Sequence, residues 1–161
     1  MILSLSRMAA MEAPDLASGA ITVQAGVVLA ALHDALDGSG LMCPMHLGAE
    51  GSAQIGGLIG SNAGGSPAFR FGMMADLVLG LEVVLPDGMV WNGLRAVETD
   101  NAGYALRKLF CGAEGTLGVV TRAVLRLSSH PRTRTTALLA LPDAAALVAF
   151  GSRLRAEAGE F

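Results

Sequence analysis

Charged residues, and lysine above all, are scarce in this chain of 161 residues. They supply 16% of the sequence, where about 25% is typical, and Lys108 is the only lysine. The net charge is −3 and the basic residues are scattered, so no basic patch indicates a nucleic-acid partner. Arg107 stands where a Walker-type phosphate loop needs a glycine before its lysine. We therefore expect no nucleic acid and no site of that type.

Cysteine and long apolar runs are also sparse. Cys43 and Cys111 lack the CxxC spacing, which favours reduced, buried thiols over a disulfide framework or a zinc site. No run of 18 or more apolar residues predicts a transmembrane helix. Residues 1–14 lack the basic start of a signal peptide and have the pattern of part of a strand. We expect a cytoplasmic location.

Apolar residues, in contrast, make up 52% of the sequence, and 21 glycines come in addition. A chain of this length can bury roughly 70% of its unfolded surface, which is enough for a core without metal or disulfide. The composition is too apolar for disorder and too poor in charge for a free-standing surface. We therefore expect a bilayer, a ligand, a partner subunit or a missing part of the same chain to cover it.

Helical and strand periodicities alternate along the chain, as in a mixed α and β fold. Leu29, Leu32 and Leu36 have helical spacing, and Asp87-Gly88 supplies a tight turn between two apolar runs. The patterns predict strands over 21–25, 77–85, 89–91, 119–127 and 135–141, and helices over 28–36, 104–110 and 143–157. A domain boundary is expected near 128–134, or just after the end of the chain.

A glycine-rich run occupies residues 51–69, where 19 uncharged residues include six glycines and three serines. Such a run lets the backbone approach a large ligand, and its N–H groups can hold a diphosphate without lysine. A tightly packed crossing through the core explains the same composition equally well. From composition alone, both interpretations stay open.

A second glycine cluster, at Gly112, Gly115 and Gly118, leads into the strand predicted over 119–127. One interpretation is a backbone that passes along a flat surface. The spacing slightly favours another, in which these glycines only end a helix and form a turn, and Glu114 is exposed to solvent. Neither cluster fits GxGxxG after a strand, so a Rossmann-type dinucleotide fold is not supported.

Five segments in order carry a specific resemblance. They are 47–65 (LGAEGSAQIGGLIGSNAGG), 70–72 (RFG), 77–88 (LVLGLEVVLPDG), 100–104 (DNAGY) and 112–121 (GAEGTLGVVT). Together they closely resemble the PCMH-type FAD-binding domain of the vanillyl-alcohol oxidase superfamily. Within it, the chain is most similar to FAD-linked dehydrogenases of D-2-hydroxy acids: D-lactate dehydrogenases, the glycolate oxidase large subunit and D-2-hydroxyglutarate dehydrogenases.

The resemblance implies an α+β fold, with a mixed sheet and flanking helices. Residues 1–130 would be the second part of the FAD-binding domain. Residues 131–161 would begin the linker and the C-terminal substrate domain of FAD-linked oxidases. The N-terminal subdomain, with its own glycine-rich loop, and most of the substrate domain have no counterpart, so we expect a fragment that self-associates or needs a complementing subunit.

The resemblance also implies which residues contact FAD. The stretch 44–65 supplies Pro44, Gly48, Ser52, Gly56, Gly57, Ser61, Asn62, Ala63 and Gly64. The stretch 114–120 supplies Glu114, Gly115, Gly118 and Val120, which favours a cofactor role there over the plain turn. Some relatives have a flavin-linked cysteine at the position of Ser52, so a serine favours non-covalent FAD.

The chain departs from the family pattern near the flavin. Pro67 stands where many of these dehydrogenases have an arginine, which Arg70 could replace, and His46 stands where aspartate is common. We interpret His46 as a structural or surface residue, and His33 and His130 as ordinary helix or linker residues. No residue is assigned as a catalytic base or a metal ligand.

The intact protein is expected to oxidise a small D-2-hydroxy acid by hydride transfer to flavin N5, with an external acceptor reoxidising the flavin. This chain alone is expected to be inactive. Two alternatives stay open: FAD-dependent alkyl transfer on the same scaffold, and a non-enzymatic or truncated flavin-binding remnant.

Overall fold

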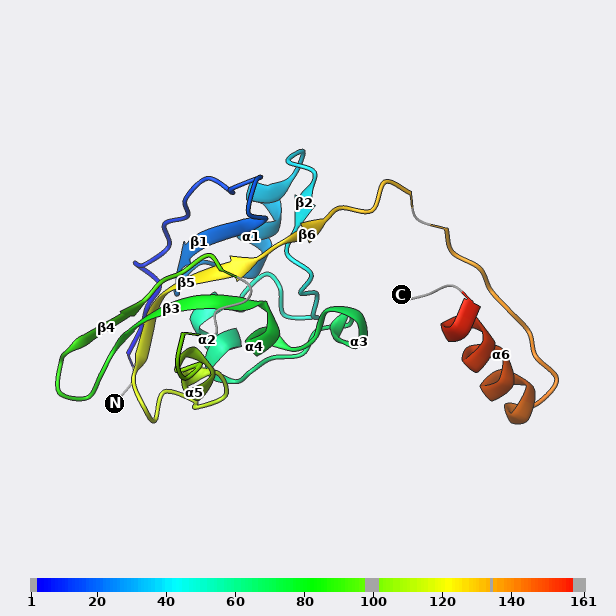
Figure 1. The fold of residues 1–161 in the computed structure, drawn as a ribbon. Helices are drawn as coiled ribbons and strands as arrows, with labels where there is room; N and C mark the ends of the chain where they lie inside the picture. Colours follow the sequence, from blue (N-terminus) through cyan, green and yellow to red (C-terminus); the bar gives the residue numbers. More distant parts are fainter. Residues whose placement is uncertain (1–2, 98–101, 134, 158–161) are drawn as a thin grey trace. The chain divides into compact units, whose positions relative to one another are not determined.

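The computed structural model describes residues 3–97, 102–133 and 135–157 (Figure 1). The chain forms two compact units, Met1–His130 and Pro131–Phe161. The first unit contains β1 (Ala20–Gln24), α1 (Leu29–Leu36), β2 (Leu41–Met42), α2 (Ile55–Gly60), α3 (Ala68–Phe71), α4 (Met74–Leu77), β3 (Val78–Val84), β4 (Val90–Gly93), α5 (Arg107–Phe110), β5 (Val119–Arg126) and β6 (Ser128–Ser129). The second contains α6 (Ala144–Glu157).

A four-stranded sheet with the order β1-β5-β3-β4 organises the first unit, and Figure 1 shows β5 between β1 and β3. Ala123 at the centre of β5 lies opposite Val23 of β1 and Leu81 of β3. β2 and β6 form a separate two-stranded ladder. The α+β class is confirmed, but the strand pairings within the described residues are antiparallel, whereas we expected a mixed sheet.

The core lies between this sheet and the helices α1, α2 and α4. Leu29, Leu32 and Leu36 of α1 are buried, which confirms the periodicity of this helix. Ile55 and Ile59 of α2 are fully buried in the same cluster. Because burying each such side chain contributes roughly 1.5–3 kcal/mol, this cluster fixes α2 firmly beside the sheet.

The β3–β4 hairpin is confirmed at the Asp-Gly turn. Gly88 has a φ of +86°, a conformation that other residues rarely adopt. The Leu85 N–H donates to the Met89 carbonyl at 2.8 Å, and the Asp87 carboxylate accepts from the Met89 N–H at 3.0 Å. The turn therefore sets the register of the sheet edge.

Two predicted strands are wrong. Residues 135–141 are exposed and pair with no strand in the described chain, so their backbone lacks the partner that a strand requires. Residues 3–14 form one isolated bridge, between Met11 and Val23, instead of a continuous strand. The helix predicted over 104–110 is shorter, and α2, α3 and α4 were not predicted because glycine and short length hide their periodicity.

Among the described helices, none has the length and hydropathy needed to cross a membrane.

Candidate functional site

The two glycine-rich segments meet at the end of α2. The Gly112 N–H donates to the Ile59 carbonyl, and the Glu114 N–H donates to the Gly60 carbonyl, both at 2.9 Å. At the start of α2, the Gly56 N–H donates to the Ala25 carbonyl at 2.7 Å. The sequence left two interpretations of residues 51–69 open, a ligand site and a crossing through the core. In the structure this run includes a helix that packs in the core, and it also forms one edge of a glycine-lined surface.

Three of the predicted FAD contacts are glycines whose faces are open. A Cβ added at Gly48, Gly57 or Gly115 would meet no heavy atom of the chain within 4 Å, and all three residues are exposed. Internal packing therefore does not require glycine at Gly48 and Gly57. Gly115 has a φ of +77°, so its backbone conformation also favours glycine.

Two other predicted contacts are glycines that the fold itself requires. A Cβ at Gly56 would lie 2.8 Å from the Cβ of Ala25, and one at Gly118 would lie 2.7 Å from Cγ1 of Val83. At Gly64 the nearest atom would be Sδ of Met73, at 2.7 Å, which belongs to the flexible end of an exposed side chain that can move away. Gly56 and Gly118 therefore have a structural reason for glycine whether or not a ligand is present.

The predicted polar contacts make bonds within the chain. The Ser61 hydroxyl donates to the Gly57 carbonyl at 2.9 Å, and the Ser52 hydroxyl donates to the Ala49 carbonyl at 3.4 Å. Oδ1 of Asn62 accepts from the Ala75 N–H at 2.9 Å, which ties the end of α2 to α4. Asn62 has a φ of +46° and Glu114 a φ of +50°, so both lie in tight turns.

The remaining predicted contacts are less accessible. Pro44 and Val120 are buried, and Val120 pairs with Val83 inside the sheet. Ala63 is half-buried, and its carbonyl accepts from the Met74 N–H at 2.9 Å. At these positions the chain offers mainly backbone to a ligand.

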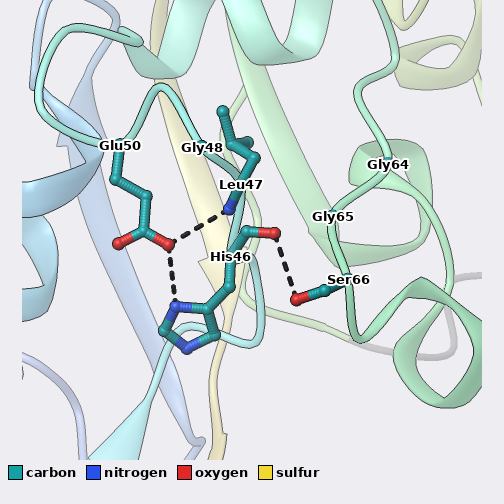
Figure 2. Close-up of a pocket in the computed structure, with 7 residues that line it drawn as sticks. All are labelled: His46, Leu47, Gly48, Glu50, Gly64, Gly65 and Ser66. Atoms are coloured by element: carbon teal, nitrogen blue, oxygen red, sulfur yellow. Dashed lines mark hydrogen bonds and ion pairs between the residues drawn. The ribbon is translucent and has the colours of Figure 1, made fainter.

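An open pocket of about 340 Å³ lies between two loop segments. Figure 2 shows its lining: His46, Leu47, Gly48 and Glu50 on one segment, and Gly64, Gly65 and Ser66 on the other. The Ser66 N–H donates to the His46 carbonyl at 2.8 Å and joins the two segments. Two predicted FAD contacts, Gly48 and Gly64, thus line one pocket.

A hydrogen bond joins His46 and Glu50 at this pocket, which sequence reasoning did not predict. Nδ1 of His46 lies 2.9 Å from Oε1 of Glu50, and that oxygen also accepts from the Leu47 N–H at 3.1 Å. The hydrogen bond from His46 holds the pKa of Glu50 below its ordinary value. Their i,i+4 spacing was the one sequence signal that could have revealed the pair.

His33 of α1 lies beside this pair. Its ring centroid is 4.5 Å from that of His46, and its Nε2–H donates to the Met45 carbonyl at 3.0 Å. Burial, followed by the nearby His46, lowers the pKa of His33. The interpretation of His33 as an ordinary helix residue therefore missed a contact that only the fold creates.

Arg70 does not line the pocket. It belongs to the short helix α3, is exposed, and its guanidinium lies 5.1 Å from the centroid of the Phe71 ring. Cys43 and Cys111 are unpaired, and Cys43 is buried. Neither cysteine lines the pocket.

Comparison with known families identifies the family to which the chain with this glycine-lined surface belongs. Residues 1–93 match the family described as "FAD binding domain". The chain belongs to this family. Its FAD-binding domain therefore includes β1 to β4 and the first glycine-rich segment, while the second segment lies beyond the matched residues.

Curated relatives extend the similarity past the matched family region. The chain is 44% identical over 143 residues to the mitochondrial D-2-hydroxyglutarate dehydrogenase of Bos taurus, covering 89% of this chain and 26% of that protein. The chain is 40% identical over 165 residues to D-2-hydroxyglutarate dehydrogenase of Xanthomonas citri pv. viticola, covering 100% of this chain and 35% of that protein. The chain thus spans about a quarter to a third of the length of these relatives.

A solved structure supports the fold. An alkyldihydroxyacetonephosphate synthase matches with a TM-score of 0.69 and 23% identity, covering 80% of this chain and 23% of that chain. At this identity the likeness concerns the fold alone.

Proposed function

We propose that this FAD-binding domain is the FAD-holding part of a flavin-dependent oxidoreductase that oxidises a D-2-hydroxy acid. The observation that supports it is the open, glycine-lined surface at Gly48, Gly57 and Gly115, which lies in a chain of the FAD binding domain family. The substrate class rests on the relatives named D-2-hydroxyglutarate dehydrogenase. Bound FAD supplies the hydride acceptor.

The residues present fit a large, flat and anionic ligand. Open glycine faces let backbone N–H groups come close to a diphosphate, whose charge they stabilise without lysine. Within this proposal Gly48, Gly57 and Gly115 approach the cofactor directly. Gly56 and Gly118 instead hold the surrounding backbone in place through close packing.

The second segment completes the proposed surface. Because Glu114 and Gly112 are bonded to the end of α2, a ligand over Gly57 would also extend along this loop. No residue of the described chain is assigned as a catalytic base. In this proposal the chain orients the flavin, and residues outside it hold the substrate and move its proton.

We also propose that FAD is held non-covalently. Ser52 has a hydroxyl at the position where a cysteine would form the covalent link to the flavin. This hydroxyl donates a hydrogen bond to the Ala49 carbonyl of the same turn. Burial raises the pKa of the Cys43 thiol to about 12, and burial also raises that of Cys111. Both thiols are therefore protonated near neutral pH and are poor nucleophiles.

The unit Pro131–Phe161 is proposed to begin the substrate domain, and a second copy or a complementing subunit is proposed to cover its exposed apolar side chains. Val148 and Leu147 of α6 are 69% and 59% exposed. A cytoplasmic location remains our proposal for this protein.

The test is a flavin titration of the purified chain, followed by gel filtration. We expect FAD to co-elute near one equivalent, and replacing Gly57 with leucine to abolish this because the side chain fills the proposed contact. Gly51→Leu is the matched control, since Gly51 is also exposed and open but is not a proposed contact. Unfolding the complex in acid should release all flavin from the protein.

Two results would contradict the proposal. A colourless wild-type protein after gel filtration would mean that these residues do not suffice for FAD binding. Equal binding by Gly57→Leu and wild type would mean that the cofactor does not lie over α2. Flavin that stays attached after unfolding would contradict the non-covalent mode alone.

A further inference from the structure

His33, His46 and Glu50 form a three-residue cluster that the proposed FAD contacts do not use. One ring nitrogen of each histidine and one carboxylate oxygen of Glu50 all lie within 4.8 Å of one another. The three residues come from two places in the chain: the half-buried His33 from α1, and the other two from the pocket loop of Figure 2. Folding alone brings them together.

The surroundings of the cluster already resemble those of ligating side chains. Nε2–H of His33 donates to the Met45 carbonyl, which fixes the ring and leaves Nδ1 as the nitrogen with a lone pair. Hydrogen bonds of this kind commonly orient metal-bound histidines. Glu50 is oriented in the same way by the Leu47 N–H.

The distances allow a metal ion after a small adjustment. Zinc bonds to nitrogen and oxygen are about 2.0–2.2 Å, which places tetrahedral ligand atoms roughly 3.3 Å apart. The side chains of His46 and Glu50 are 45% and 33% exposed, so both can rotate to close the remaining gap. His33 is the fixed member, and the two loop residues are the adjustable ones.

From this geometry we propose that His33, His46 and Glu50 bind one divalent transition-metal ion, with zinc as the best match. Two neutral imidazoles and one carboxylate are a donor set that zinc uses with an open fourth position. Magnesium and calcium prefer oxygen ligands throughout, so the same cluster binds them poorly. The ion would link α1 to the loop that lines the pocket.

The proposal does not depend on FAD. His46 and Glu50 line the same pocket as Gly48, but none of the three cluster residues is a proposed FAD contact. Metal binding can therefore be measured on the chain without flavin, and flavin binding on the chain with a chelator. Failure of one measurement leaves the other intact.

The experiment is a cobalt and zinc titration of the tag-free, metal-stripped chain. We expect one Co²⁺ per chain, with visible d–d absorption, displacement of cobalt by Zn²⁺, and no competition from Mg²⁺. His46→Ala and Glu50→Gln should each weaken binding at least tenfold, because each removes one of three ligands. Both positions are partly exposed, so these variants should keep the fold, as circular dichroism can check.

His130→Ala is the matched control, because it removes a histidine outside the cluster and should leave binding unchanged. His33→Ala should weaken binding as strongly as His46→Ala. A wild-type chain that binds no cobalt, or variants that bind it as the wild type does, would overturn the proposal. So would a near-ultraviolet thiolate-to-cobalt band, because it would place the ion on a cysteine.

Discussion

At the scale of single residues, local environment decides which groups are available for chemistry. Cys43 is 1% exposed, and burial raises the pKa of its thiol to about 12. Cys111 is half-buried, and its pKa is raised by burial while Arg107 and Lys108 oppose the shift. Similar residues in the sequence therefore differ in reactivity because of the fold.

We predict that Cys43 does not react with a thiol reagent in the folded protein at pH 8. Because only a very small fraction is thiolate when the pKa is about 12, and because the group is buried, its labelling requires unfolding. Cys111 should react faster. Mass spectrometry after timed labelling distinguishes the two, and rapid native labelling of Cys43 would contradict its burial.

Open and packed glycines illustrate a similar distinction. The composition predicts that glycine is important throughout 51–69. It does not tell at which positions the fold requires glycine and at which positions a bound ligand would require it. Gly48 and Gly57 face open space, whereas Gly65 lies against the His46 backbone. Only the tertiary structure separates these roles, because the neighbours come from distant parts of the chain.

At the scale of elements, α2 combines both roles in adjacent residues. Gly56 faces Ala25 and Gly57 faces open space, so one helix packs on β1 and presents a glycine surface. Its buried residues, Ile55, Leu58 and Ile59, anchor it in the core. A helix was not expected here because three glycines in six residues weaken the helical signal.

This arrangement predicts that substitutions at two neighbouring glycines change the stability of the protein in opposite directions. Gly56→Ala should destabilise the protein by about 1–3 kcal/mol, because its Cβ would overlap Ala25. Gly57→Ala should stabilise it by about 0.5–1 kcal/mol, because the position is open and alanine favours the helix. Urea unfolding measures both, and equal effects would contradict the packing of α2.

The strands were easier to predict than the short helices. The β3–β4 hairpin and β5 follow from apolar runs and an Asp-Gly turn, which are local signals. The strand expected at 135–141 failed because its apolar pattern had no neighbouring strand to pair with in the described chain. A strand needs a partner, and a single stretch of sequence does not contain that information.

At the scale of the whole molecule, the apolar composition raised the question of what covers the surface. Large apolar side chains remain exposed in both units, among them Tyr104 at 95% and Val148 at 69%. Where such groups gather into a contiguous patch, they mark a site of association. FAD over the glycine surface would cover only part of them.

We therefore predict that the chain self-associates as its concentration rises, and that a shortened chain ending at His130 does so less. The shortening removes the exposed apolar residues of α6, while the first unit keeps its own core. Sedimentation velocity at several concentrations measures the change. A monomer at every concentration would show that the exposed side chains do not drive association.

The sequence by itself determined the fold class, the main strands, the hairpin and the resemblance to FAD-binding domains, because these depend on local patterns and on ordered motifs. The tertiary structure alone decided which glycines face open space, and it alone joined the two glycine segments at the end of α2. It also placed His33 beside His46 and Glu50. Such contacts depend on how distant segments pack, and burial energy summed over the whole core fixes that packing.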